Sequence, residues 1–137
     1  MDYLSGKQNN LVQSNKVEKK TKTPAVKESV FSSLCKTIVS VLNPDEQALI
    51  SEKFLSPEIV SVMKDKELIE CINAFFKNNL NISETSRNAF LHRNTLLYRI
   101  DKIHKITGLN IRNFEDAMSF KILTIVYDKA TERLGQK

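Results

Sequence analysis

Glycine is scarce in this sequence, which has three among 137 residues: Gly6, Gly108 and Gly135. A phosphate-binding loop or a dinucleotide-binding turn needs several glycines within a few positions, because the backbone must approach the phosphates closely. Both motifs are therefore excluded. The acidic residues are scattered, and no Ser/His/Asp or Cys/His set lies close along the chain, so no motif for acid-base or nucleophilic catalysis is present. We expect a protein that is not an enzyme and carries no cofactor.

Cysteine and long apolar runs are equally rare. Cys35 and Cys71 each lie among apolar residues at helical spacing, and neither has a second Cys or His at the interval that zinc sites use. The sequence thus predicts two buried thiols and no metal site. No stretch approaches the ~18 apolar residues that a membrane span requires, and the N-terminal MDYLSGKQNN lacks the apolar run of a signal peptide. We expect a cytoplasmic protein with no membrane partner and no evident small-molecule ligand.

The charge balance favours a polyanionic partner. Lys and Arg number 21 against 16 Asp and Glu, a formal net charge of +5, which is compatible with nucleic acid and with anionic lipid. Residues 1–27 are rich in Lys, Asn, Gln, Ser and Thr, so they cannot bury enough apolar surface to offset the entropy lost on ordering. We predict a disordered basic tail there, which is either a solvated linker or a non-specific phosphate contact.

From Val30 onward the apolar residues follow the three-and-four spacing of amphipathic helices. A first helix begins near Val30, and Asn43-Pro44-Asp45-Glu46 supplies the cap, the proline and the glutamate that start a second one. Ser56-Pro57 repeats this signal, and Asp65 opens a further helix with a broad apolar face. Asn113 with Asp116 starts a last helix, whose apolar residues wrap most of its circumference, so it is either buried or shared with a partner. With no strand pattern or internal repeat, the sequence predicts an all-α domain of about six to seven helices.

Two further helices, between those that start at Asp65 and Asn113, form a predicted helix-turn-helix. Ser83 can cap a short helix over Glu84 to about Phe90, and Asn94 can cap a helix that runs to Thr107, where Gly108 ends it. Residues 91–93 alone separate the two helices, and so short a connection forces them to cross steeply. We expect Asn94 to Thr107 to be the recognition helix.

The recognition helix divides into two faces. Leu96, Ile100 and Ile103 form an apolar stripe, while large polar residues gather at the turn and the first two helical turns. Between residues 84 and 112 six basic residues accompany two acidic ones. This pattern predicts contacts with phosphates and base edges, and its alternative is an ordinary solvated helix face. His92 is equally interpretable as a DNA contact and as a core histidine or a hydrogen-bond donor that stabilises the turn.

These residues carry a family resemblance. Ser83-Glu84-Thr85-Ser86, followed by Phe90-Leu91-His92-Arg93-Asn94-Thr95-Leu96-Leu97-Tyr98-Arg99-Ile100 and by Ile106-Thr107-Gly108-Leu109, resembles the C-terminal helix-turn-helix domain of purine-catabolism (PucR) and sugar-diacid (CdaR) regulators. The string is more distantly similar to the factor for inversion stimulation (Fis). The resemblance covers about residues 65–127 and implies bacterial transcription regulation, with the recognition helix in the major groove. The candidate DNA-binding residues are Ser83, Thr85, His92, Arg93, Asn94, Thr95, Tyr98, Arg99 and Lys102.

The sequence also departs from that family. Its members usually carry Ala where Ser86 stands and a larger aliphatic residue where Ala89 stands. They carry a long N-terminal sensory region, whereas this chain has a tail and about three helices before residue 65. The resemblance therefore does not imply that this chain binds a purine or a diacid.

The expected organisation has three parts: a tail over residues 1–27, supporting or dimerising helices over 28–64, and the helix-turn-helix domain over 65–137. We expect a homodimeric, sequence-specific regulator that binds double-stranded DNA, because two half-sites are needed when one motif makes few contacts. The alternative is a protein-interaction module that dimerises with a longer related regulator and antagonises it.

Overall fold

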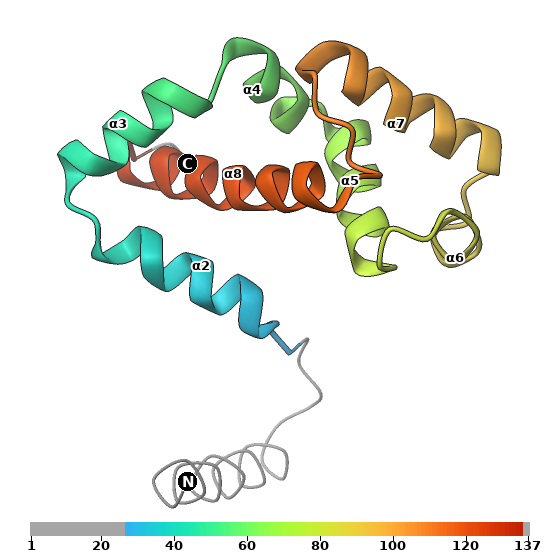
Figure 1. Ribbon diagram of the computed structural model, residues 1–137, viewed down its shortest axis with the longest axis horizontal. Helices are drawn as coiled ribbons and strands as arrows, with labels where there is room; N and C mark the ends of the chain where they lie inside the picture. Colours follow the sequence, from blue (N-terminus) through green and yellow to red (C-terminus); the bar gives the residue numbers. More distant parts are fainter. Residues whose placement is uncertain (1–26, 136–137) are drawn as a thin grey trace, which may run out of the picture. The chain divides into compact units, whose positions relative to one another are not determined.

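The computed structural model describes residues 27–135, and within that range every regular element is an α-helix (Figure 1). The helices are α2 (Val30–Val41), α3 (Pro44–Phe54), α4 (Pro57–Lys64), α5 (Lys66–Lys77), α6 (Ile82–Asn88), α7 (Arg93–Thr107) and α8 (Phe114–Arg133). The all-α class is therefore confirmed. The chain divides between Ser33 and Leu34 into two units, and the second unit contains the described residues from 34 onward. The predicted basic tail lies outside the described residues, except for Lys27.

Three helices begin where their capping signals predict. At α3 the Asn43 side chain accepts a hydrogen bond from the Glu46 amide over 2.8 Å, and the Glu46 carboxylate accepts one from the Asn43 amide over 2.9 Å. Ser56 caps α4, and Asp65 caps α5 by accepting from the Leu68 amide. Each cap satisfies a backbone donor that has no partner inside the helix. The local sequence is sufficient to set these boundaries.

Two helices begin earlier than the sequence analysis predicts. Asn81, not Ser83, caps α6, with its side-chain oxygen 2.8 Å from the Glu84 amide. The earlier start is possible because Asn79 and Leu80 have positive φ angles of 57° and 61° and reverse the chain just before it. His92, not Asn94, caps α7. Both corrections depend on the three-dimensional turn that precedes the helix.

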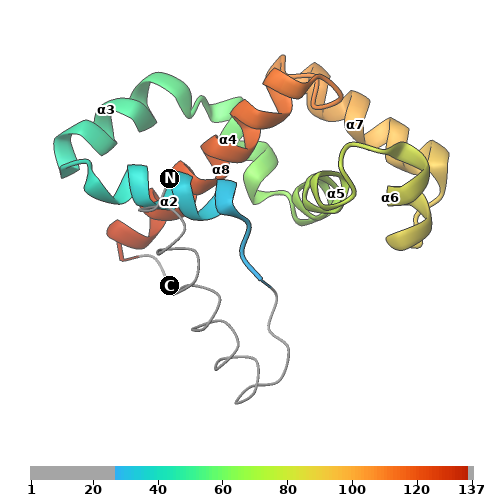
Figure 2. The same cartoon turned by 60° about the horizontal axis from the view of Figure 1, so that its bottom comes forward.

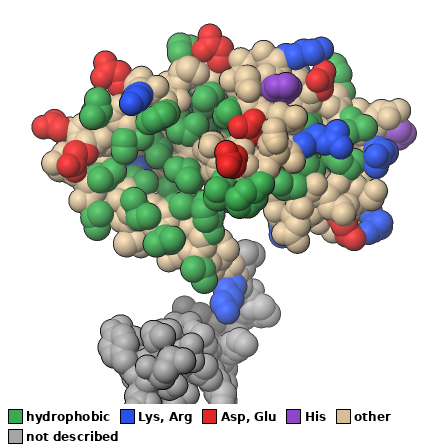
Figure 3. Space-filling model, in the orientation of Figure 1, with side chains coloured by type: hydrophobic (Ala, Val, Ile, Leu, Met, Phe, Trp, Pro, Cys, Tyr) green, Lys and Arg blue, Asp and Glu red, His purple; other side chains and the backbone are tan. Residues whose placement is uncertain are grey.

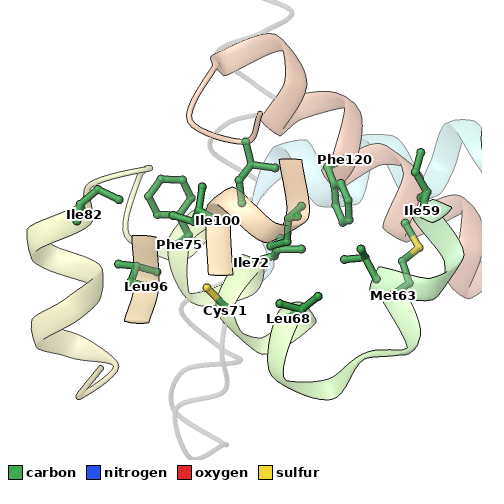
Figure 4. Packing of buried hydrophobic residues seen from close by; sticks show 13 residues of the cluster. Ile59, Met63, Leu68, Cys71, Ile72, Phe75, Ile82, Leu96, Ile100 and Phe120 are labelled. Carbon is green, nitrogen blue, oxygen red and sulfur yellow. The ribbon is translucent and has the colours of Figure 1, made fainter. Parts of the chain in front are cut away.

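The hydrophobic core joins α4, α5, α6, α7 and the first half of α8. Figure 4 shows Phe75 and Ile72 of α5 directed toward Leu96 and Ile100 of α7, with Phe120 of α8 beside them. The largest side chains in this core are fully buried: Phe75, Phe120, Ile72, Leu96, Ile103 and Ile111. Because α4 packs on both α5 and α7, it belongs to this core and supports α7 directly.

The helices α2, α3 and α8 meet through polar as well as apolar contacts. The Gln47 side-chain amide donates to the carbonyls of Val39 and Leu42 at the end of α2, and its oxygen accepts from Arg133 of α8 over 2.9 Å. Helix α3 also packs along α8. Gln47 therefore connects α3 both to the preceding α2 and to α8, which is distant in sequence.

A short link joins α7 to α8, and α7 ends at Gly108 as the sequence predicts. Gly108 caps α7 with φ of 79°, a left-handed conformation that glycine adopts without strain. Asp116 accepts a hydrogen bond from the Asn110 amide, and Asn113 makes no side-chain capping bond. Ala117, Phe120, Ile125 and Val126 of α8 are buried in its own chain. None of the helices within residues 27–135 combines the length and the apolarity that crossing a membrane requires.

A matched pair of phenylalanines tests this packing. Phe75→Ala is expected to lower the free energy of unfolding by about 3–5 kcal/mol, because it removes a fully buried ring and leaves a cavity. Phe114→Ala, at a side chain that is 69% exposed, is expected to change it by less than about 1 kcal/mol. Urea unfolding followed by circular dichroism measures both, and equal losses for the two variants would contradict the packing.

Candidate nucleic-acid interface

Helices α6 and α7 form the predicted helix-turn-helix. They pack against each other, and both pack against α5. Four residues, Ala89 to His92, separate the end of α6 from the start of α7, and Figure 2 shows the two helices next to each other at one end of the second unit. The short link fixes the direction of α7 relative to α6.

The turn is held by two interactions between Ser86 and Leu91. The Leu91 amide donates to the Ser86 carbonyl over 2.9 Å, and the Ser86 hydroxyl donates to the Leu91 carbonyl. Inside this loop Phe90 adopts φ of 54°, in the left-handed region, and the chain reverses within a few residues. Ser86 is one of the two departures from the family pattern, and its hydroxyl braces the turn.

The faces of α7 separate as the apolar spacing predicts. Leu96, Ile100 and Ile103 are buried against the core, and the opposite side of the helix is exposed. Figure 3 shows Lys, Arg and His side chains gathered on the side of α6 and α7, whereas hydrophobic side chains predominate over α2, α3 and α8. The exposed face of α7 is thus a polar, mostly cationic surface on a rigid support.

His92 stabilises the start of α7. Its Nδ1 atom accepts a hydrogen bond from the Asn94 amide over 3.1 Å. His92 therefore stabilises the turn, but as an acceptor and not as the donor or the core residue that the sequence suggests. An accepting Nδ1 requires the imidazole proton to lie on Nε2. His92 is exposed, so this Nε2 proton can be donated to a ligand while Nδ1 keeps the helix capped.

Arg93, Asn94 and Ser83 lie together at the N-terminal end of the motif. All three are exposed, and the Arg93 guanidinium donates a long, 3.4 Å hydrogen bond to the Ser83 hydroxyl across the two helices. The side chain of Asn94 has no hydrogen bond within the described residues, so its amide is open to solvent. The first turn of α7 contains no acidic residue, and the positive end of the helix dipole is therefore not neutralised there.

Further along α7 the candidate residues differ in exposure. Tyr98 and Lys102 are exposed, and Thr95 is half-buried. Asn94, Tyr98 and Lys102 follow one another at intervals of four residues, which puts them along one side of the helix. Tyr98 and Lys102 extend the polar surface of the first turn by two helical turns.

Thr85 departs from the expected contact set. Its side chain is fully buried, and its hydroxyl donates to the Asn81 carbonyl over 2.7 Å within α6. The spacing of Thr85 from the exposed Ser83 places the two side chains on different sides of a helix. In this fold Thr85 cannot meet a ligand at the surface.

Arg99 faces the flank of α7 and contacts α5. Its side chain is 23% exposed and forms an ion pair with Glu67, with the Nη2 and Oε2 atoms 3.6 Å apart. It also lies near Cys71, where burial raises the pKa of the thiol and the Arg99 charge partly lowers it. Cys71 and Cys35 are buried free thiols, as predicted. Arg99 therefore combines a structural contact with partial access to solvent.

Ion pairs modify the charge excess around the motif. Arg87 pairs with Glu84 at 2.9 Å, and Lys105 pairs with Asp101 at 3.1 Å. Arg93, Lys102 and Arg112 have no ion pair within the described part of the chain. Exposed pairs of this kind contribute about 0–1 kcal/mol, so a phosphate can compete for their cations. No group of three or more His, Cys, Asp or Glu within residues 27–135 is arranged to hold a metal ion.

Two residues have positions that the sequence analysis did not assign. Asn81 caps α6, a role that the Asn-rich string before Ile82 could have indicated. Phe90 was expected at the end of the first helix, but it lies in the turn with its side chain 95% exposed. Helical periodicity does not reveal such a residue, because Phe90 lies outside both helices and has a positive φ angle.

Comparison with known proteins agrees with this geometry. Residues 68–125 match the family model of the PucR C-terminal helix-turn-helix domain, as the resemblance predicted. The chain is 28% identical over 116 residues to the uncharacterised protein YsfB of Bacillus subtilis, 44% over 45 residues to the carbohydrate diacid regulator of Escherichia coli, and 27% over 59 residues to the purine catabolism regulatory protein of B. subtilis. The matched segment includes α6 and α7, and two of these relatives are named as regulators.

The matched relatives are longer proteins. The aligned residues are 85%, 33% and 43% of this chain, and 30%, 12% and 11% of those three relatives. The match to YsfB is longer than the 68–125 segment and therefore includes residues outside it. No solved structure matches this chain significantly.

Thr85→Val tests the structural role of the buried threonine. Valine preserves the shape of the side chain but removes the hydroxyl that donates to Asn81, so we expect the free energy of unfolding to fall by about 1 kcal/mol. Because Thr85 does not reach the surface, DNA affinity of the folded protein should not change. Urea unfolding and fluorescence anisotropy with labelled duplex measure the two effects. A large loss of DNA affinity at an unchanged free energy of unfolding would instead indicate that Thr85 contacts DNA.

Proposed function

We propose that this chain, whose residues 68–125 are a PucR C-terminal helix-turn-helix domain, is a transcriptional regulator that binds double-stranded DNA sequence-specifically. In this proposal α7 enters the major groove with its N-terminal end leading. Arg93 and Asn94 read base edges, and Ser83, His92, Thr95, Tyr98 and Lys102 position the helix on the backbone or add base contacts. Arg99 contributes a secondary contact at the flank of the helix.

The observation that carries the proposal is the structure of the first turn of α7. Three exposed residues in succession, His92, Arg93 and Asn94, present hydrogen-bond donors at one helix end. The side chains chemically suit DNA, since arginine pairs with two acceptors of guanine and asparagine with the donor and acceptor of adenine. Loops seldom hold such groups rigidly, but here the apolar face of α7 is buried one turn away.

The electrostatics of the same helix end favour a phosphate. An α-helix carries about half a positive charge at its N-terminus, where the first backbone amides point outward. The first turns of α6 and α8 contain acidic residues, whereas that of α7 contains none. The Nε2–H group of His92 also suits a phosphate, because a phosphate oxygen can accept its hydrogen bond.

We further propose that the regulator acts as a homodimer through α2. Leu34, Ile38 and Val41 are all more than half exposed, and their spacing puts them on one stripe of the helix. By contrast, the central apolar residues of α8 are mostly covered by their own chain, so α8 offers less surface for a partner. In this proposal α2 dimerises the chain, whereas α4, also within residues 28–64, supports the DNA-binding domain of residues 65–137 by packing on α5 and α7.

The same stripe favours a second candidate function. A chain that joins a longer related regulator through α2 would act as a protein-interaction module and could antagonise that regulator. DNA titrations at two salt concentrations separate the two functions, because saturable and salt-sensitive binding belongs to the first.

The base-reading assignment predicts a difference between two kinds of variant. Arg93→Ala and Asn94→Ala should each weaken binding to a selected genomic duplex by about 1–3 kcal/mol, with little effect on random duplex. Lys102→Ala should weaken both about equally and reduce the salt slope by about 1. Anisotropy titrations at several salt concentrations measure this.

Arg112→Ala is the matched control for Arg93→Ala, because it removes an exposed arginine that lies beyond the far end of α7. It should cause no loss of specificity. If Arg93→Ala and Asn94→Ala reduced affinity equally on selected and random DNA, neither residue would read bases.

The dimer proposal predicts that Ile38→Asp yields a monomer, because an aspartate at the centre of the stripe would lose its water without gaining a partner. Ser40→Asp introduces the same charge on another side of α2 and should leave the dimer intact. Sedimentation velocity measures the oligomeric state. A dimer that persists in Ile38→Asp, or a monomeric unmodified chain, would refute the role of α2.

A further inference from the structure

Phe90 combines backbone strain with an exposed ring. Among the described residues, three that are not glycine have positive φ angles: Asn79, Leu80 and Phe90. Asparagine tolerates this conformation, and Leu80 is partly buried against the core, which offsets its strain. Phe90 has neither compensation. Its side chain is 95% exposed, more than any other large apolar side chain in the described part of the chain.

The stability of the isolated protein does not account for this residue. Glycine or asparagine would adopt the φ of 54° with less strain, and the exposed ring gains no energy from burial. Single exposed apolar residues are common on protein surfaces, but they seldom occupy positions where a bulky side chain is an outlier. Strained positions of this kind concentrate at functional sites.

The position of Phe90 relates it to the proposed DNA contacts. It lies in the turn, two residues before the cap His92 and three before Arg93. Its neighbour Leu91 is fixed by the two interactions with Ser86 and by its packing on the core. The backbone that carries the ring is therefore rigid, and the ring projects into solvent at the end of α7 that would lead into the groove.

We infer that Phe90 is a DNA-contacting residue whose ring packs on an apolar group of a nucleotide where α7 enters the major groove. Two groups have this chemistry: the 5-methyl group of thymine and the face of a deoxyribose. Contact would remove water from both the ring and the DNA, a gain that the free protein cannot make. The inference rests on the proposed function and adds an apolar contact to its polar ones.

Phe90→Asn is the decisive variant, because it removes the ring and keeps a residue that tolerates the left-handed turn. We expect it to bind a genomic duplex selected with the unmodified full chain about five- to tenfold more weakly, the effect of burying part of a phenylalanine ring. The melting temperature should stay within about 5 °C or rise. Phe90→Tyr retains the ring and should bind within about twofold of the unmodified chain.

Phe54→Asn is the matched control. Phe54 is a half-exposed phenylalanine at the end of α3, away from α6 and α7 in Figure 1. The same substitution there should leave DNA affinity unchanged. Sedimentation velocity of Phe90→Asn should show the oligomeric state of the unmodified chain.

A duplex in which deoxyuridine replaces thymidine distinguishes the two apolar groups. If Phe90 contacts a thymine methyl, the unmodified chain binds the deoxyuridine duplex more weakly than the thymidine duplex. Phe90→Asn then binds the two duplexes with equal affinity. If it contacts a deoxyribose, Phe90→Asn is weaker than the unmodified chain by the same factor on both duplexes. Either result supports the inference.

The inference and the proposed function fail in different ways. If the unmodified chain shows no saturable binding to any duplex, the proposed function is refuted and this inference with it. If the unmodified chain binds DNA and Phe90→Asn binds it equally well, the inference alone is overturned. A change of oligomeric state in Phe90→Asn would also overturn it, because the ring would then belong to a protein contact.

Discussion

The burial of one face of α7 is the interaction on which the rest of the structure depends. Leu96, Ile100 and Ile103 enter a core that includes Phe75 of α5 and Phe120 of α8. Because a helix is rigid over this length, fixing one face also fixes the direction of every side chain on the other. The polar end of α7 thus gains its orientation from apolar contacts that no ligand would touch.

The interface then depends on how the turn enters this helix. Ser86 closes the turn onto Leu91, and His92 caps α7 with one ring nitrogen while the other stays available. The hydrogen bonds that stabilise the start of α7 therefore also fix the direction of the hydrogen-bond donors in its first turn. Preorganised donors lose little conformational entropy on binding, which is the main cost of ordering a flexible loop on DNA.

The predictability of each feature follows from the range of the interactions that decide it. The caps Asn43, Ser56 and Asp65 act within three residues, and their positions were correct from the sequence. Apolar spacing likewise identified the buried face of α7. The caps of α6 and α7 were misplaced, because turns with positive φ angles precede both helices. Asn79 and Leu80 precede α6, and Phe90 precedes α7. The burial of Thr85 and the contact of Arg99 with Glu67 depend on neighbouring helices, which spacing along one helix cannot reveal.

The link from Gln47 to Arg133 has a consequence for the order of folding. Helices α4 to α7 pack together within residues 57–107, whereas α3 packs on α8, and the hydrogen bond between them joins residues 86 positions apart along the chain. Contacts between near neighbours close short loops and form early, and distant ones wait for the whole intervening chain. During synthesis from the N-terminus, we therefore expect the helix-turn-helix to assemble most of its core while α3 still lacks its contacts with α8.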